Sequence, residues 1–185
     1  FCCPPNVLRT LAEVSGMAYS RAGDELWVNL YGGNRLSTEL NGSRLAITQT
    51  TDYPWEGRIE FAVDECSDQP FALKFRIPGW CDGATLSIND EAVAGKLASG
   101  SYAELRRPWK VGDRVTLNLP MPPRLIEANP QVEETRNQLA VQRGPIVYCL
   151  ESPDLPAGVR VHEVALAADA TLRPVFEPRL LGGVT

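Results

Sequence analysis

The hydrophobic pattern of the chain changes its period near residue 24. Before that point, apolar residues recur at steps of three and four, which places them on one face of a helix: Val7, Leu8, Leu11, Val14, Met17 and Ala18. Pro4 and Pro5 suit a helix entrance, where a missing N–H costs nothing. We therefore predict a helix over residues 4–20. Its apolar face must dock against the structure that follows or against helices that this chain does not contain.

From Leu26 onward the period is two, which is typical of strands with one buried face. Three segments alternate most regularly: Phe71, Leu73, Phe75 and Ile77; Ile59, Phe61 and Val63; and Val115, Leu117 and Leu119. Turn signals separate the strands, and Asn41-Gly42 is the strongest of them for a hairpin. Short alternating strands at this spacing predict an antiparallel β-sandwich.

A proline-rich segment, MPPRLIEANPQVEE at residues 121–134, interrupts the strand pattern. Another strand-like run follows, LAVQRGPIVYCLE, in which the glycine and proline of QRGP suggest a bulge or an edge position. Weaker strand patterns lie at residues 159–166 and 172–176. We expect three regions: a helix at 1–23, a first β-sandwich at 24–126 and the start of a second, incomplete β-sandwich at 127–185.

Composition and charge exclude several classes of protein. Hydrophobic residues make up 44% and charged residues 22%, as in a globular protein. The net charge is −5 and the 18 Lys and Arg residues are scattered, so neither a nucleic acid nor a membrane is expected as a partner. The chain begins FCCPPN, and we expect its true N-terminus to be missing. Five cysteines at irregular spacing favour a reduced, cytoplasmic location over a disulfide framework.

The adjacent Cys2 and Cys3 are the first candidates for chemistry. Thiolates are good zinc ligands, and a helix entrance favours the thiolate form. A zinc site usually has four ligands, and the remaining candidates, Cys66, Cys81, Cys149 and the single histidine His162, are distant in the sequence. From the residues alone, structural thiols and a metal or nucleophile role both stay open.

A second candidate is TTDYPWEG, which combines Asp52, Tyr53, Trp55 and Glu56. It could form a sugar-stacking patch with two carboxylates, as in glycosidases. The alternative, which we favour, is a proline-kinked loop whose aromatic residues pack against their neighbours. The Arg-Pro-Trp clusters RIPGW and RRPW are interpreted in the same way, as loop anchors.

Taken in order, FCCPPN, WVNLYGG, TQTTDYPWEG, FALKFRIPGW, LRRPWKVGDRVTLNLPM and LAVQRGPIVYCLE resemble glycoside hydrolase family 127 of β-L-arabinofuranosidases, from Phe1 to about Glu151. The resemblance implies a catalytic (α/α)6 barrel followed by two β-sandwiches, with the helix of this chain as the last barrel helix. It also implies a retaining mechanism in which Cys2 is the nucleophile and both Cys2 and Cys3 bind zinc. The second sandwich is tied to dimer formation in some relatives, so a homodimer is possible.

The remaining zinc ligands (a glutamate and a third cysteine) and the glutamate acid/base of the family lie upstream of the motifs found here. We therefore expect this chain alone neither to hydrolyse glycosides nor to bind zinc tightly. Two alternatives need no catalysis. A carbohydrate-binding sandwich would stack sugars on Tyr53, Trp55, Trp80 and Trp109, which glycan binding would test. A structural or dimer-forming module would be tested by the mass of the chain in solution.

Overall fold

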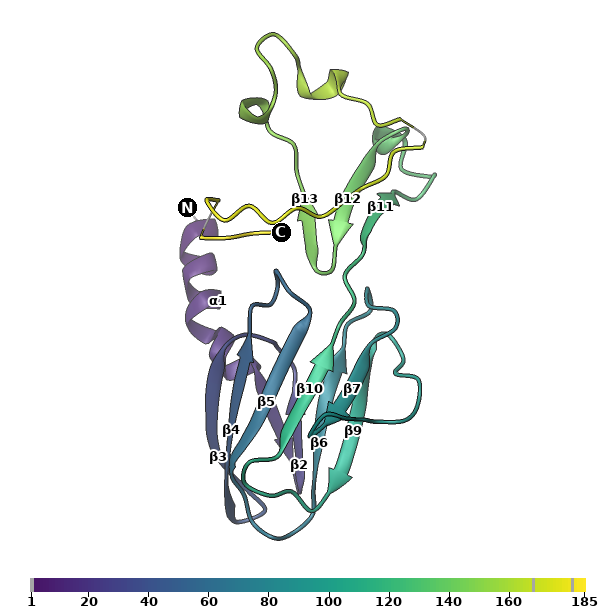
Figure 1. Ribbon diagram of the computed structural model, residues 1–185. Coiled ribbons are helices and arrows are strands. Elements are labelled where there is room, and N and C mark those ends of the chain that lie inside the picture. The colour runs from purple at the N-terminus through teal and green to yellow at the C-terminus, as the bar shows by residue number, and fades with distance from the viewer. Residues whose placement is uncertain (1, 168, 181) are drawn as a thin grey trace. The chain divides into compact units, whose positions relative to one another are not determined.

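The computed structural model describes residues 2–167, 169–180 and 182–185, and they form two compact units that divide between Pro120 and Met121 (Figure 1). The first unit contains one helix and ten strands, and the second contains one small sheet and three short 3-10 helices. Among the described residues, no helix is long and apolar enough to cross a membrane.

Helix α1 (Cys3–Met17) confirms the predicted N-terminal helix, although it ends at Met17 rather than at residue 20. The reason is that Tyr19 already begins strand β1 and pairs with Val28. The sandwich does not cover the apolar face of α1, and five of its side chains are at least 43% exposed: Val7, Leu8, Leu11, Val14 and Met17.

Two sheets form the first unit and face each other as a sandwich (Figure 1). Four strands form one sheet in the order β1-β2-β6-β9: β1 (Tyr19–Ala22), β2 (Glu25–Val28), β6 (Phe71–Ile77) and β9 (Ser101–Arg107). Six form the other in the order β3-β4-β5-β10-β7-β8: β3 (Asn34–Leu40), β4 (Ser43–Thr51), β5 (Arg58–Glu65), β10 (Arg114–Asn118), β7 (Thr85–Ile88) and β8 (Glu91–Ala92).

The pairing is antiparallel with one exception, because β2 and β6 run parallel, with Leu26 opposite Leu73. Three strands of the opposite sheet, β3 to β5, separate them in the chain. The chain passes through four connections from β2 to β6, and an even number of reversals restores its original direction, so β6 runs the same way as β2. The sequence predicted the alternation of β6 but not its parallel pairing with β2.

The alternating residues of β5, β6 and β10 form the core between the sheets, as predicted. Phe61 and Phe75 lie on opposite sheets, and their ring centroids are 4.8 Å apart. Trp109 is buried as well, and its Nε1 donates a hydrogen bond of 3.1 Å to the Phe71 carbonyl. The core therefore continues beyond the strands into the loop after β9.

Turn residues with positive φ support two hairpins, and the sequence predicted the first of them from Asn41-Gly42. Asn41 and Gly42 have φ values of 51° and 77°, and they join β3 to β4. Asn89 and Asp90 have φ values of 49° and 68° between β7 and β8. Two successive positive φ values match the twist of a two-residue hairpin, and Asn and Gly adopt them at low cost.

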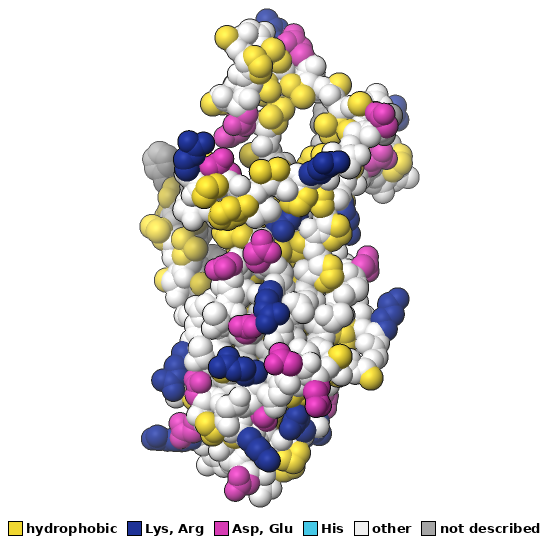
Figure 2. Space-filling model, viewed as in Figure 1, with side chains coloured by type: hydrophobic (Ala, Val, Ile, Leu, Met, Phe, Trp, Pro, Cys, Tyr) yellow, Lys and Arg dark blue, Asp and Glu magenta, His cyan; other side chains and the backbone are white. Residues whose placement is uncertain are grey.

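The second unit contains a three-stranded sheet in the order β11-β12-β13: β11 (Pro123–Glu127), β12 (Leu139–Arg143) and β13 (Ile146–Tyr148). Strand β11 pairs with β12, so residues 123–126 belong with this sheet rather than with the sandwich. Gly144 and Pro145 form the turn between β12 and β13 instead of a bulge, and β13 is an edge strand of this sheet. Figure 2 shows apolar side chains gathered on this part of the molecule.

The weaker strand patterns at residues 159–166 and 172–176 do not form strands. The first contains a 3-10 helix, η3 (Val161–Glu163), and the second belongs to no helix or strand. Two further 3-10 helices are η1 (Glu133–Thr135) and η2 (Ser152–Asp154). All buried apolar residues in the described part of the chain lie at or before Leu119. The second unit therefore offers few buried contacts that could hold a weak strand in place.

Gly57 tests how tightly the β4–β5 loop packs against the end of β10. A Cβ atom at Gly57 would lie 2.0 Å from the Leu119 carbonyl oxygen, whereas one at Gly79 would meet no heavy atom within 4 Å. We expect Gly57→Ala to lower the free energy of unfolding by about 1–3 kcal/mol, the usual cost of overpacking. Gly79→Ala is the control in urea denaturation. Equal midpoints for the two variants would show that the loop is not tightly packed.

Candidate functional site

Cys2 and Cys3 lie at the N-terminal end of α1, and both are exposed. Their Sγ atoms are 3.7 Å apart, so they are not joined by a disulfide. The helix entrance is regular, because the Asn6 N–H donates a hydrogen bond of 3.2 Å to the Cys2 carbonyl. The helix thus presents two accessible thiols side by side.

The spacing of the two sulfur atoms fits a shared zinc ion. Two thiolates at a Zn–S distance of about 2.3 Å and a tetrahedral angle are separated by about 3.8 Å, and here the Sγ atoms are 3.7 Å apart. Among the described residues, however, no group of three or more His, Cys, Asp or Glu side chains could hold a metal ion. The donor set therefore fits one half of a structural or catalytic zinc site.

The other cysteines are engaged in the fold or lie in the second unit. The Cys66 thiol is 3.4 Å from the Trp109 carbonyl oxygen, and its pKa is raised, first by burial and then by the charges of Asp113 and Asp68. Cys81 is buried. Cys149 is exposed in the second unit, as is His162 in η3. None of them joins Cys2 and Cys3 in a metal-binding group of the described residues.

The TTDYPWEG loop is a compact turn between β4 and β5. The Tyr53–Pro54 peptide bond is cis, and the N–H groups of Trp55 and Glu56 both donate to the Asp52 carbonyl. The Tyr53 ring packs edge to face on Tyr31, with centroids 5.8 Å apart. This arrangement agrees with the packing interpretation for Tyr53, while the Asp52 and Glu56 side chains are exposed.

The prediction that Trp109 could stack a sugar, as one of four aromatic residues of a carbohydrate-binding sandwich, is wrong. That side chain is 1% exposed, and the Arg107 guanidinium lies 5.3 Å from its ring centroid, so no sugar can stack on it. Trp80 and Tyr53 are partly buried against the core. The sequence could not show this, because an exposed and a buried tryptophan after Arg-Pro have the same local pattern.

Several carboxylates of the sandwich are held in their ionised form. Hydrogen bonding to Lys74 lowers the pKa of Glu104, and hydrogen bonding to Arg106 lowers that of Asp24. A hydrogen bond from the Asn89 side-chain amide lowers the pKa of Asp113. A general acid must carry a proton near neutral pH, which requires a raised pKa. These three carboxylates are therefore unsuited to that role.

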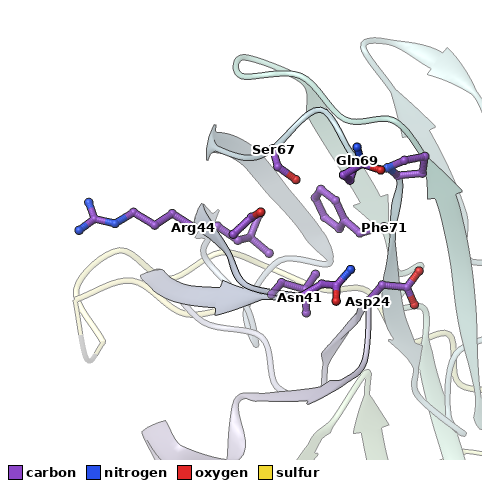
Figure 3. Close-up of a pocket in the computed structure, with 10 residues that line it drawn as sticks. Asp24, Asn41, Arg44, Ser67, Gln69 and Phe71 are labelled. Atoms are coloured by element: carbon purple, nitrogen blue, oxygen red, sulfur yellow. The ribbon is translucent and has the colours of Figure 1, made fainter.

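A small cavity lies at the end of the first unit away from α1, with six lining residues labelled in Figure 3. It encloses about 30 Å³, enough for a few water molecules but not for a sugar ring. Phe71 at its wall is buried, and Asp24 is already paired with Arg106. The Arg44 guanidinium points away from Phe71 (Figure 3). This cavity is not a substrate site.

Sequence reasoning missed a polar joint where α1 meets the sandwich. Asn29 bonds to the Met17 carbonyl at the end of α1, and Tyr19, two residues further on, bonds to Asn34 and Gln49. The available signal was an Asn placed directly after the apolar strand in WVNLYGG. A polar residue such as Asn29 does not fit the interior of a strand, so it marks the end of β2. The local sequence could not indicate which distant residues Asn29 binds.

Comparisons with known proteins agree with the two units. A family model described as the β-L-arabinofuranosidase GH127 middle domain matches residues 25–121. A second, described as the glycoside hydrolase family 127 C-terminal domain, matches residues 123–178.

Individual relatives match nearly the whole chain. A non-reducing end β-L-arabinofuranosidase of Bifidobacterium longum subsp. longum is 32% identical over 99% of this chain and 28% of its own length. The crystal structure of a GH127 β-L-arabinofuranosidase from Geobacillus stearothermophilus T6 is 44% identical, with a TM-score of 0.89 over 98% of this chain and 28% of that one. A further GH127 β-arabinofuranosidase structure is 34% identical, with a TM-score of 0.88 over 98% of this chain and 31% of its own. This chain therefore spans less than a third of the length of each of these relatives.

The burial of the cysteines predicts an order of alkylation by iodoacetamide. The exposed Cys2, Cys3 and Cys149 should react first. Cys66 should be slower, because its raised pKa lowers the thiolate fraction, and its rate should increase as the pH rises toward that pKa. Buried Cys81 should be protected. Peptide mass spectrometry measures the order, with the urea-denatured chain as control. Reaction of native Cys81 as fast as Cys149 would contradict it.

Proposed function

Because the chain belongs to glycoside hydrolase family 127, we propose that it is the C-terminal portion of a retaining glycosidase in which Cys2 is the nucleophile. The substrate class is a β-L-arabinofuranoside or a similar sugar, the activity named for its relatives. The observation that carries the proposal is the exposed thiol pair at the entrance of α1, with sulfur atoms 3.7 Å apart.

The proposed reaction has two displacements at the anomeric carbon. First the Cys2 thiolate attacks, the C–S bond forms, and the glycosidic C–O bond breaks as the leaving oxygen takes a proton from a general acid. Water then attacks the same carbon, loses a proton to the conjugate base, and the C–S bond breaks to return the thiolate. Each displacement inverts the configuration, so the product retains it.

Cys2 and Cys3 would also hold zinc in the intact enzyme. The fit of their sulfur spacing to a tetrahedral site supports this assignment. When bound, zinc would keep both sulfur atoms as thiolates near neutral pH. Cys3 would act as ligand only, and Cys2 as ligand and nucleophile.

The general acid and the other zinc ligands would come from the part of the enzyme that this chain does not span. The lowered pKa values of Glu104, Asp24 and Asp113 support an acid from elsewhere. The exposed apolar face of α1 would dock against the helices of a catalytic barrel. On this proposal the chain alone is inactive, because it supplies one half of the site. The free state of its described cysteines supports a reduced, cytoplasmic setting.

Removal of the proposed nucleophile tests the reaction. In the full-length enzyme, Cys2→Ala should lower kcat/KM for an aryl β-L-arabinofuranoside by at least about 10³-fold, since the two-step path is then closed. Cys149→Ala, which removes an exposed thiol in the second unit, is the matched control and should change kcat/KM less than about twofold. Substantial arabinofuranosidase activity in Cys2→Ala would refute the nucleophile assignment.

The roles of the two cysteines can be separated through zinc. In the full-length enzyme, Cys3→Ala should weaken zinc binding by at least about 100-fold. Mutation of a residue that only hydrogen-bonds to a metal ligand already lowers metal affinity by about 10–100-fold, and Cys3 would be a ligand itself. Added zinc should restore part of the activity of Cys3→Ala but none of that of Cys2→Ala. Competition with a chromogenic chelator measures the affinity. Unchanged zinc affinity in both variants would exclude this metal site.

A further inference from the structure

Asn29 uses every polar group it has at the junction between α1 and the sandwich. Its side-chain amide donates to the Met17 carbonyl at 3.2 Å and to the Ser20 hydroxyl at 2.8 Å. Its side-chain oxygen accepts from the Tyr102 hydroxyl at 2.8 Å. Its main-chain carbonyl accepts from Arg76 Nε at 2.6 Å. One residue thus links the last turn of α1 to β1, β6 and β9.

The main chain completes this link. The N–H groups of Asn29 and Leu30 both donate to the Ala18 carbonyl, at 2.9 and 3.3 Å. Ala18 is the only residue between the end of α1 and the start of β1. The carbonyls of Met17 and Ala18, which the helix itself leaves without partners, are therefore held by Asn29 and its neighbour.

A second set of bonds connects the same junction to the opposite sheet. The Tyr19 hydroxyl donates to Asn34 Oδ1 at 2.8 Å and accepts from Gln49 Nε2 at 3.0 Å. Gln49 lies on β4 and is 2% exposed, and its Oε1 accepts from the Gly32 N–H. Because both sheets hold the junction, the direction of α1 is set by the sandwich.

This direction matters because the thiols lie at the far end of the helix. Cys2 precedes α1 and Met17 ends it, and fifteen residues span about 22 Å. A tilt of about 3° at the junction moves the far end by about 1 Å, a displacement that can cost about 10²-fold in rate. Within this chain the apolar face of α1 makes no compensating contact with the sandwich, since its side chains are exposed. In the intact enzyme that face would dock against the barrel, and the hydrogen bonds of Asn29 would hold the end of α1 that meets the sandwich.

We propose that Asn29 is a positioning residue that fixes the direction of α1 and thereby places Cys2 and Cys3 for reaction. The claim about direction stands on the contacts of Asn29, and the claim about reaction rests on the proposed function. The two parts are tested separately, so that failure of one can be told from failure of the other.

The first experiment measures the direction of α1 in this chain. Residual dipolar couplings of backbone amides report how α1 is oriented relative to the sandwich. We expect Asn29→Ala to reorient α1 by more than about 3° or to reduce its order, with unchanged couplings within the sandwich. Asn29→Asp keeps the acceptor for Tyr102 but loses both donors, and it should behave like Asn29→Ala. Asn118→Ala on β10 is the control. An α1 that keeps its orientation in both Asn29 variants would overturn the proposal.

The second experiment measures catalysis in the full-length enzyme. Asn29→Asp should lower kcat by about 10–10²-fold while KM, zinc content and melting temperature stay close to those of the parent and of Asn118→Ala. A merely structural role would instead lower the melting temperature and leave kcat per folded molecule unchanged, and that result would overturn the positioning role. If Cys2→Ala remains active while Asn29→Ala reorients α1, the proposed function fails and only the structural part of this inference survives.

Discussion

The apolar contact between the two sheets is the interaction on which the rest of the first unit depends. Side chains from both sheets meet there, with Phe61 and Phe75 at its centre and Trp109 extending it into a loop. Each large side chain buried in such a core contributes about 1.5–3 kcal/mol relative to an exposed one. The core fixes the strand ends, and the strand ends fix the loops that hold α1. The position of the thiol pair therefore depends on contacts far from the thiols themselves.

The apolar surface of the chain is distributed unequally over its elements. The sandwich buries its apolar residues, whereas the apolar face of α1 stays exposed, and among the described residues no buried apolar side chain lies beyond Leu119. Large exposed apolar patches are uncommon on monomeric proteins and usually mark contact surfaces. This contrast agrees with a chain that spans less than a third of the length of its relatives. The sandwich is complete in its packing, while α1 and the second unit carry surfaces suited to further contacts.

On the proposed function, the chemistry of the site would be divided between this chain and the rest of the enzyme. Cys2 and Cys3 supply soft ligands at a suitable separation, whereas the carboxylates that the sandwich holds by hydrogen bonds and ion pairs have lowered pKa values and serve the fold. Such paired carboxylates stabilise a sheet surface but cannot donate a proton at neutral pH. On the proposed function, the sandwich is a support, and the hydrogen bonds of Asn29 connect it to the helix that carries the thiols.

The sequence by itself determined the helix, the strands with strict alternation, the Asn41-Gly42 hairpin and the thiol pair, because each depends on residues close together in the chain. Only the tertiary structure decided which strands pair. The parallel pairing of β2 with β6, the place of β11 beside β12 and the burial of Trp109 all depend on distant partners. The end of α1 at Met17 also depends on a partner outside the helix, since Tyr19 pairs with β2 instead of extending the helix. A local period specifies which face of an element is apolar, but the neighbour that covers this face is chosen by the packing of the whole unit.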